Sequence, residues 1–143
     1  LTLPSNPYTL PVSAWAGAGD AIQRDFARDD APFLRQAVAL VDGRVLSDSA
    51  GLRPFFHAAG KSYSPLWSPD VAWLFTGHPV PDAARRLRAL GYSHLLIKRS
   101  DISADFLRAT GALASLDGQL RPALANGTFV LMQLAPDEST AHP

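Results

Sequence analysis

The stretch "LRALGYSHLLIKRSD", Leu87 to Asp101, decides the fold. Gly91 ends a run of apolar residues at helical spacing, and the compact apolar segment Ser93–Arg99 follows it. A short apolar run bounded by a helix stop and a polar cluster is typical of a strand buried in a parallel sheet. The stretch therefore predicts a helix, a glycine turn and a buried strand in succession.

The segments before this stretch repeat the alternation. "RVLSD" (Arg44–Asp48) predicts a short strand, and Ser49–Ala59 predicts a helix that Gly60 ends. Further upstream we expect one helix beginning near Gly19-Asp20 and a second helix capped by Asp29-Asp30. Strands that alternate with helices in this way indicate a layered α/β arrangement.

The segments after it predict a helix and a hairpin. The helix runs from Ile102 to about Leu116, a break is allowed at Gly111, and Ile102, Phe106, Leu107 and Leu113 are expected to face inward. Asn126-Gly127 lies between two apolar runs, which is the strongest short-range signal for a hairpin. We expect its strands at about 120–125 and 128–134.

These elements predict the fold class and its boundaries. The fold is expected to be a layered, Rossmann-like α/β domain, with a mainly parallel sheet flanked by helices and a C-terminal antiparallel hairpin. Residues 18–135 form this single domain. Pro4, Pro7 and Pro11 predict an extended lead-in strap over residues 1–17, and residues 136–143 are expected to be a frayed tail.

Composition narrows the functional classes. The 143 residues include 13 basic and 13 acidic side chains, so no net charge favours nucleic acid. The chain has no cysteine, which excludes disulfides, thiolate metal sites and cysteine nucleophiles. No apolar run reaches the roughly 18 residues that span a bilayer. Because the sequence opens without an initiator methionine, we expect it to belong to a longer protein.

The strongest candidate site lies where the strand "RVLSD" meets the next helix. Ser47, Asp48 and Ser49 occupy this junction, where backbone N–H groups and the helix dipole favour anionic or hydroxylated ligands. The competing interpretation is that Asp48 or Ser49 simply caps the helix, as these residue types commonly do.

A second candidate lies at the end of the buried strand. Lys98 and Arg99 could meet a phosphate there, or their charged groups could extend into solvent while Ser100 or Asp101 caps the next helix. "AGAGD" (Ala16–Asp20) lacks the third glycine and the preceding strand of a dinucleotide-binding loop. No cofactor is therefore indicated.

The stretch "SYSPLWSPDVAWLF" (Ser62–Phe75) raises the question of a stacking surface. Its prolines predict an extended segment at a sheet edge, followed by a short helix that begins at Ser68-Pro69. We expect the stretch mainly to supply core packing, with a stacking surface as the alternative. Trp73 is expected to pack against the domain, and Trp67 is the better candidate for a partly exposed ligand contact.

Catalytic and metal chemistry find little support in the sequence. A triad of Ser47, His57 and Asp70 can be drawn, but no G-x-S-x-G elbow accompanies it. The four histidines form no zinc-binding motif, and His94 is expected to be a hydrogen-bonded core residue. We therefore assign no catalytic residue and no metal ligand.

Four segments taken in order carry a family resemblance: "RVLSDSAGLRPFFHAAG", "YSPLWSPDVAWLF", "ARRLRALGYSHLLIKR" and "NGTFVLMQL". Together they resemble the C-terminal soluble region of bacterial polytopic membrane glycosyltransferases of the GT-C class, related to the dolichyl-phosphate-mannose and aminoarabinose transferases. The resemblance covers about residues 34–135. In that family the catalytic carboxylate lies in the membrane part, so no residue of this chain inherits a catalytic role.

The resemblance implies a non-catalytic accessory domain on the extracytoplasmic, periplasmic side of a bacterial membrane. The implied partners are an N-terminal membrane-spanning part and a lipid-linked sugar or its acceptor, and the implied role is to position the substrate or to stabilise the membrane part. The parent protein would be the enzyme, and this part alone would be inactive. The alternative is a stand-alone α/β module that binds a small sugar or nucleotide near Asp48 and Lys98.

Overall fold

The computed structural model describes residues 26–135. The predicted strap, the helix expected near Gly19 and the predicted tail lie outside the described residues. The described chain is a mixed α/β fold built on one five-stranded sheet, in the order β2-β1-β3-β5-β4. Its strands are β1 (Arg44–Ser47), β2 (Tyr63–Pro65), β3 (Tyr92–Lys98), β4 (Leu120–Ala125) and β5 (Phe129–Leu134).

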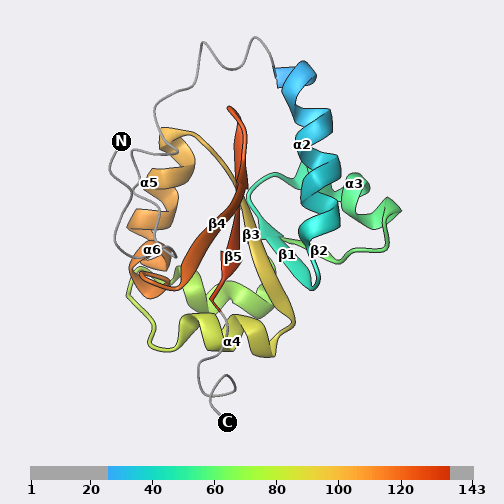
Figure 1. Ribbon diagram of the computed structural model, residues 1–143. Helices are drawn as coiled ribbons and strands as arrows, with labels where there is room; N and C mark the ends of the chain where they lie inside the picture. The colour runs from blue at the N-terminus through green and yellow to red at the C-terminus, as the bar shows by residue number, and fades with distance from the viewer. Residues whose placement is uncertain (1–25, 136–143) are drawn as a thin grey trace.

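Helices pack on both faces of this sheet (Figure 1). One face is covered by α2 (Phe26–Leu40) and α3 (Arg53–Ala58), which η2 (Ala50–Leu52) precedes. The other face is covered by η3 (Pro69–Phe75), α4 (Ala83–Ala89), α5 (Asp101–Ala109) and α6 (Ala112–Ser115). The central strand therefore lies between two layers of helices.

Strand alternation divides the core in two. Successive strand side chains point to opposite faces, so in β3 Leu95 and Ile97 join the core under α4 and α5, while Leu96 joins the core under α2. All three are at most 2% exposed. The continuous apolar run in "SHLLIK" follows from burial on both faces.

The sheet is only partly parallel, which corrects the expectation of a mainly parallel one. β1 pairs in parallel with β2 and β3, whereas β5 pairs antiparallel with both β3 and β4. The C-terminal hairpin forms one edge of the sheet, as the sequence predicts, with β4 outermost. Its second strand lies directly against β3 and so supplies two of the four pairings.

The hairpin lies where the sequence predicts it. Asn126 makes the turn with its side chain, because its Oδ1 accepts the backbone N–H groups of Thr128 (2.9 Å) and Phe129 (2.7 Å). Pro122 lies in the outer strand β4, beside a shift in register, where a missing N–H is tolerated.

Two helix predictions need correction. The helix expected to begin after Asp29-Asp30 begins earlier, at Phe26, and Pro32 lies inside it. The helix expected over Ser49–Ala59 is a short 3-10 segment followed by the six-residue helix α3. Pro54 explains the second change, because proline is favoured in the first turn of a helix and interrupts one that has already begun.

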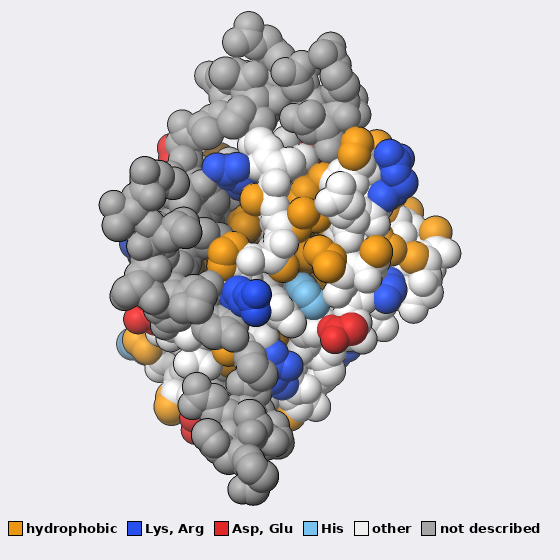
Figure 2. All heavy atoms as spheres, in the orientation of Figure 1, with side chains coloured by type: hydrophobic (Ala, Val, Ile, Leu, Met, Phe, Trp, Pro, Cys, Tyr) orange, Lys and Arg blue, Asp and Glu red, His pale blue; other side chains and the backbone are white. Residues whose placement is uncertain are grey.

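The space-filling view shows the surface between β4 and α2. Hydrophobic side chains gather there, with basic and acidic side chains around them (Figure 2). Phe33 of α2 stacks on Phe129 of β5 in the core, with ring centroids 5.9 Å apart. This contact anchors α2 to the hairpin.

Candidate functional site

Three parallel strands end at one edge of the sheet, which we call the carboxyl edge. β1 ends at Ser47, β2 at Pro65 and β3 at Lys98. Open α/β sheets place their ligands outside this edge. The residues that follow these strands therefore meet in space, although they lie far apart in the chain.

Asp48 links the loops at the carboxyl edge. Its Oδ1 accepts the backbone N–H of Lys98 (3.1 Å) and the hydroxyl of Ser49 (3.1 Å). Its Oδ2 accepts the hydroxyl of Ser103, in the first turn of α5. The carboxylate thus joins the end of β1 to the end of β3 and to α5, and it does not cap the helix after β1.

A groove of about 570 Å³ lies beside this carboxylate, and we call it the carboxyl-edge groove. Its apolar walls come from η3, from α5 and from the residues after β2, and its polar groups come from the end of β1 and the start of α5. The lining residues are Asp48, Leu66, Trp67, Ala72, Phe75, Ile102, Ser103 and Phe106.

The groove exposes large apolar side chains. Trp67 is 67% exposed, Ile102 83% and Phe106 45%. The ring of Phe75 lies against that of Phe106, with centroids 5.7 Å apart, and closes one wall. An apolar cleft with a few fixed polar groups is the usual form of a small-ligand site.

Ser47 and Ser49 make hydrogen bonds that hold the loop containing Asp48. Ser47 is fully buried, and its hydroxyl accepts the backbone N–H of Ser49 (3.0 Å). The hydroxyl of Tyr63 donates to the carbonyl oxygen of Ser49. Burial raises the pKa of Tyr63 to about 12. These contacts fix the loop that carries the carboxylate.

The two basic candidates do not line the groove. Lys98 reaches Asp48 only through its backbone N–H, and its side chain is exposed. Arg99 is directed to the hairpin turn instead, because its guanidinium donates to the carbonyl oxygen of Asn126. A phosphate subsite built from these two side chains is therefore not formed.

The sequence did not identify four of the residues that line the groove: Phe75, Ile102, Ser103 and Phe106. Ile102 and Phe106 were expected to face inward, but they are exposed. Leu107 is buried and Leu113 packs partly buried against the core, as predicted. The sequence signal for these residues was their spacing. Ile102 and Phe106 lie four positions apart, about one helical turn, so they share one side of a helix. Ser103 and Leu107 follow them by one residue and share the neighbouring side. That spacing defines a second apolar stripe on α5 without saying which stripe meets the sheet.

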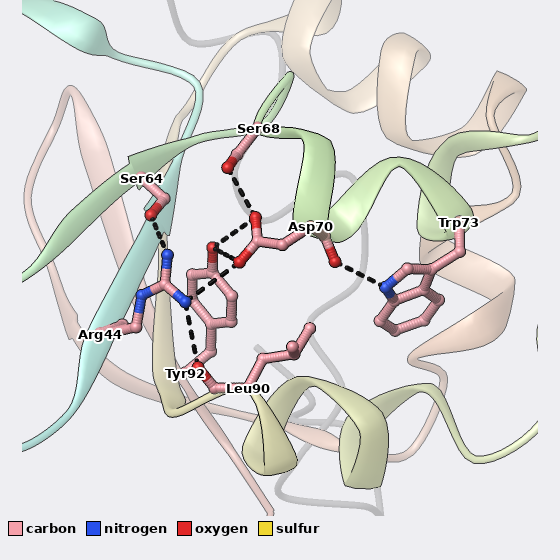
Figure 3. A network of polar contacts seen from close by, with 7 residues as sticks. All are labelled: Arg44, Ser64, Ser68, Asp70, Trp73, Leu90 and Tyr92. Carbon is pink, nitrogen blue, oxygen red and sulfur yellow. Dashed lines mark hydrogen bonds and ion pairs between the residues drawn. The ribbon is translucent and has the colours of Figure 1, made fainter.

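A polar network ties the amino ends of β1 and β3 to η3 (Figure 3). The guanidinium of Arg44 contacts the carboxylate of Asp70 (3.0 Å) and the hydroxyl of Ser64 (2.7 Å), and it lies 4.2 Å from the ring centroid of Tyr92. The hydroxyl of Tyr92 donates to the same carboxylate at 3.0 Å. Residues from two strands, β1 and β3, therefore converge on one carboxylate of η3.

The surroundings of Asp70 mark this network as structural. The hydroxyl of Ser68 donates to Asp70 at 2.6 Å, and the indole N–H of Trp73 donates to its backbone carbonyl at 2.9 Å. The hydrogen bond from Ser68, with those from Tyr92 and Arg44, lowers the pKa of Asp70 below its usual 3.8. Trp73 is half-buried and carries the guanidinium of Arg86 on its ring, at 3.9 Å from the centroid.

The triad drawn from the sequence is not assembled. Ser47 is bonded to the loop after β1, His57 accepts a hydrogen bond from Arg53 within α3, and Asp70 belongs to the Arg44 network. Within residues 26–135, no group of three or more histidine, aspartate or glutamate side chains is arranged to hold a metal ion.

His94 is the buried core histidine that the sequence predicts. It is 2% exposed, and its Nδ1 lies 2.6 Å from the hydroxyl of Ser93. Burial lowers the pKa of His94 below 6.5, which the nearby Asp42 carboxylate opposes and Arg88 reinforces. His94 therefore belongs to the core and not to a candidate ligand-binding site.

A second hollow, of about 620 Å³, lies between the start of α4 and the end of α6. Arg88 lines it, but its guanidinium is bound to the carbonyl oxygens of Leu134 and Ala135. This hollow lacks the exposed aromatic side chains of the carboxyl-edge groove, which is therefore the better candidate site.

Within residues 26–135, no helix combines the length and the apolar character needed to cross a bilayer. No protein-family model, no curated protein and no solved structure matches the chain.

Proposed function

We propose that this chain is a non-catalytic accessory domain of a membrane glycosyltransferase, and that its carboxyl-edge groove holds the sugar of a lipid-linked substrate or of its acceptor. The proposal includes a Rossmann-like layered fold, a periplasmic location and a membrane-spanning partner in the same protein. Its biological context rests on the four ordered segments that resemble such enzymes. The groove is the observation that carries the binding role.

The chemistry of the groove suits a sugar ring. One face of a pyranose is lined by C–H groups and can stack on the exposed indole of Trp67, while its rim carries hydroxyl groups. Asp48 and Ser103 supply polar atoms at the same groove. Because a carboxylate offers about four lone-pair positions and Asp48 uses three, it can accept one more hydroxyl.

The same features argue for binding and against catalysis by Asp48. Its two oxygens already hold β1, β3 and α5 together, so proton transfer through it would loosen the edge. The carboxylate also disfavours a nucleotide, since a phosphate beside it would meet like charge while Arg99 is bound elsewhere. A neutral, hydroxylated ligand fits best.

The second candidate function is a stand-alone α/β module that binds a small sugar or nucleotide. The exposed Trp67 beside Asp48 supports its sugar-binding form equally well. The genomic sequence upstream of Leu1 separates the two candidates. Several apolar segments of about 20 residues in one reading frame support the accessory domain, whereas a start codon at residue 1 contradicts it.

Titration of the 15N-labelled chain with neutral monosaccharides tests the groove. We expect saturable shifts of the Trp67 indole N–H signal and of the Asp48 and Ser103 amide signals. Trp67→Ala should weaken binding about two- to twelvefold, because an aromatic stacking contact contributes about 0.5–1.5 kcal/mol.

Phe55→Ala is the matched control, since Phe55 is 51% exposed on α3 and lies outside the groove. It should bind like the unchanged chain. Absence of shifts with every sugar, or equal binding by the Trp67→Ala variant, would contradict the proposed site.

A further inference from the structure

We propose that Asn126 is a site of spontaneous deamidation, that the fold holds this reaction back, and that the carboxylate it produces releases α2 from the hairpin turn. An asparagine followed by glycine is the most reactive pair for this reaction, because no side chain shields the attacking glycine nitrogen. Asn126 precedes Gly127 in the turn between β4 and β5, and both residues are half-buried. The site lies outside the carboxyl-edge groove and is independent of the proposed function.

The reaction needs only atoms of the chain and water. The backbone nitrogen of Gly127 forms a bond to the side-chain carbon Cγ of Asn126, and the bond from Cγ to the amide nitrogen breaks. The proton of the Gly127 N–H passes to the departing amide nitrogen, which leaves as ammonia. Water then opens the resulting five-membered succinimide at either carbonyl, which gives aspartate or isoaspartate. The reaction therefore adds one negative charge at residue 126.

The structure holds Asn126 at each of its polar atoms. Its backbone N–H donates to the carbonyl oxygen of Phe129 (3.0 Å), and its carbonyl oxygen accepts the guanidinium of Arg99. Its side-chain Oδ1 accepts the backbone N–H groups of Thr128 (2.9 Å) and Phe129 (2.7 Å). Its Nδ2 donates to Oδ1 of Asp30 at 2.9 Å. Because Cγ must turn toward the Gly127 nitrogen before a bond can form, the folded chain reacts only while these side-chain contacts are open.

The product changes the contact between the turn and α2. The tip of the hairpin lies near the start of α2, where Asn126 reaches Asp30 (Figure 1). Aspartate at position 126 keeps one oxygen for the N–H groups of Thr128 and Phe129, but its second oxygen replaces the amide group that donates to Asp30. Asp30 is only 5% exposed, so water screens the two carboxylates poorly and they repel each other. Isoaspartate also inserts a methylene group into the backbone of the turn.

Ageing of the full chain at mildly alkaline pH tests the site and its protection. Isoelectric focusing separates the product, since one negative charge is added to a formal net charge of zero, and peptide mapping locates it. The other asparagine, Asn6, precedes Pro7, whose nitrogen carries no hydrogen and cannot form the succinimide. Asn126 should react at least about tenfold more slowly in the folded chain than in guanidinium chloride, because reaction is confined to molecules with an open turn.

Two results of this ageing experiment would overturn the proposal. No deamidation at Asn126 in guanidinium chloride would remove the site. Equal rates in the folded and unfolded chain would show that the turn gives no protection.

Asp30→Ala measures the protection that comes from α2. The variant removes the acceptor of the Asn126 amide group, so the rate in the folded chain should rise about two- to twelvefold, as expected for the loss of one hydrogen bond. The rate in guanidinium chloride should stay the same. Gln36→Ala, at an exposed position on α2, is the matched control and should leave both rates unchanged. A folded-state rate in Asp30→Ala equal to that of Gln36→Ala would overturn the role of Asp30.

Asn126→Asp reproduces the product and tests the release of α2 without ageing. Backbone amide hydrogen exchange in the first turns of α2 should become several-fold faster than in the unchanged chain. Adding Asp30→Asn supplies an amide group that can donate to the new carboxylate, so the double variant should exchange as slowly as Asp30→Asn alone. Unchanged exchange in Asn126→Asp, or equally fast exchange in the double variant, would overturn the release.

Discussion

At the scale of the residue, Asp48 shows how one carboxylate organises the candidate site. Its position after β1 predicts either a helix cap or a ligand contact, and its observed partners are Lys98, Ser49 and Ser103. Two of these lie 50 and 55 residues away in the chain. No local pattern specifies such partners, because local patterns report spacing along one element only.

Replacing Asp48 tests this organising role. Asp48→Ala leaves a backbone N–H and two hydroxyl groups without their acceptor, so the free energy of unfolding should fall by about 1–3 kcal/mol. Urea unfolding followed by far-UV circular dichroism measures the change. Asp105→Ala is the control, since the contact of Asp105 within residues 26–135 is an exposed pair with Arg108 on α5, and its loss should change stability by no more than about 0.5 kcal/mol. Equal losses in the two variants would refute the role.

Trp67 is the second residue whose role depended on the structure. The prolines beside it predict a sheet edge, and β2 is an edge strand. Its 67% exposure then follows, because it comes two residues after β2, beyond the cover of η3. Trp73 lies inside η3 and packs, as expected. The two indoles therefore differ in position although their sequence contexts look alike.

At the scale of the element, Gly111 divides the last helical segment. It separates α5 from α6 with φ at 84°, a conformation that favours glycine. A Cβ atom at this position would lie 2.8 Å from the backbone carbonyl of His78, which precedes α4. The break allowed by the sequence is thus also a point of close contact between two segments.

Gly111→Ala should be more destabilising than Gly60→Ala, which tests the effect of the left-handed backbone conformation without a steric clash. Gly60 also has a positive φ, 75°, but open space surrounds its missing side chain. Gly60→Ala should cost about 1–2 kcal/mol from the left-handed conformation, and Gly111→Ala about 1–3 kcal/mol more from overpacking. Urea midpoints of the two variants make the comparison. A smaller loss for Gly111→Ala would show that the contact with His78 relaxes freely.

The hairpin turn is the element that connects the sheet to α2. Asn126→Ala removes acceptors for two backbone N–H groups and the donor to Asp30. We expect a loss of about 1–3 kcal/mol in the free energy of unfolding. Arg121→Ala, at an exposed position on β4, should change it by less than about 0.5 kcal/mol. In the Asn126→Ala variant, backbone amide hydrogen exchange should also become faster in the first turns of α2. Unchanged exchange there would contradict the proposed link between the hairpin turn and α2.

At the scale of the whole molecule, two buried groups set the pH range of greatest stability. Burial lowers the pKa of His94 below 6.5, so below that pH the unfolded chain binds a proton that the folded chain does not. Burial raises the pKa of Tyr63 from 10.0 to about 12, so between these values the unfolded chain releases a proton that the folded chain keeps. Stability should therefore fall on both sides of a plateau between about pH 6.5 and 10.

Two variants separate the arms of this profile. Each arm has a limiting slope of about 1.4 kcal/mol per pH unit for one proton. His94→Gln should flatten the loss of unfolding free energy just below pH 6.5. Tyr63→Phe should reduce the loss of unfolding free energy above pH 10. Tyr92 also contributes to that loss, because burial raises its pKa. Asp70, with its lowered pKa, adds a further loss only below about pH 3.8. His57→Gln, at an exposed site, should retain the acid arm, and loss of that arm would contradict the assignment to His94.

The sequence by itself determined the alternation of strands and helices, the glycine stops and the hairpin at Asn126-Gly127. These features depend on side-chain periodicity and on backbone preferences that act over a few residues. Only the tertiary structure decided that β5 inserts beside β3, that α5 turns Ile102 and Phe106 outward, and that Asp48, Trp67 and Ser103 share one groove. The physical reason is that strand pairing and helix docking bring together residues far apart in the chain, such as Asp48 and Ser103, which are 55 positions apart, and packing of the whole chain fixes those contacts.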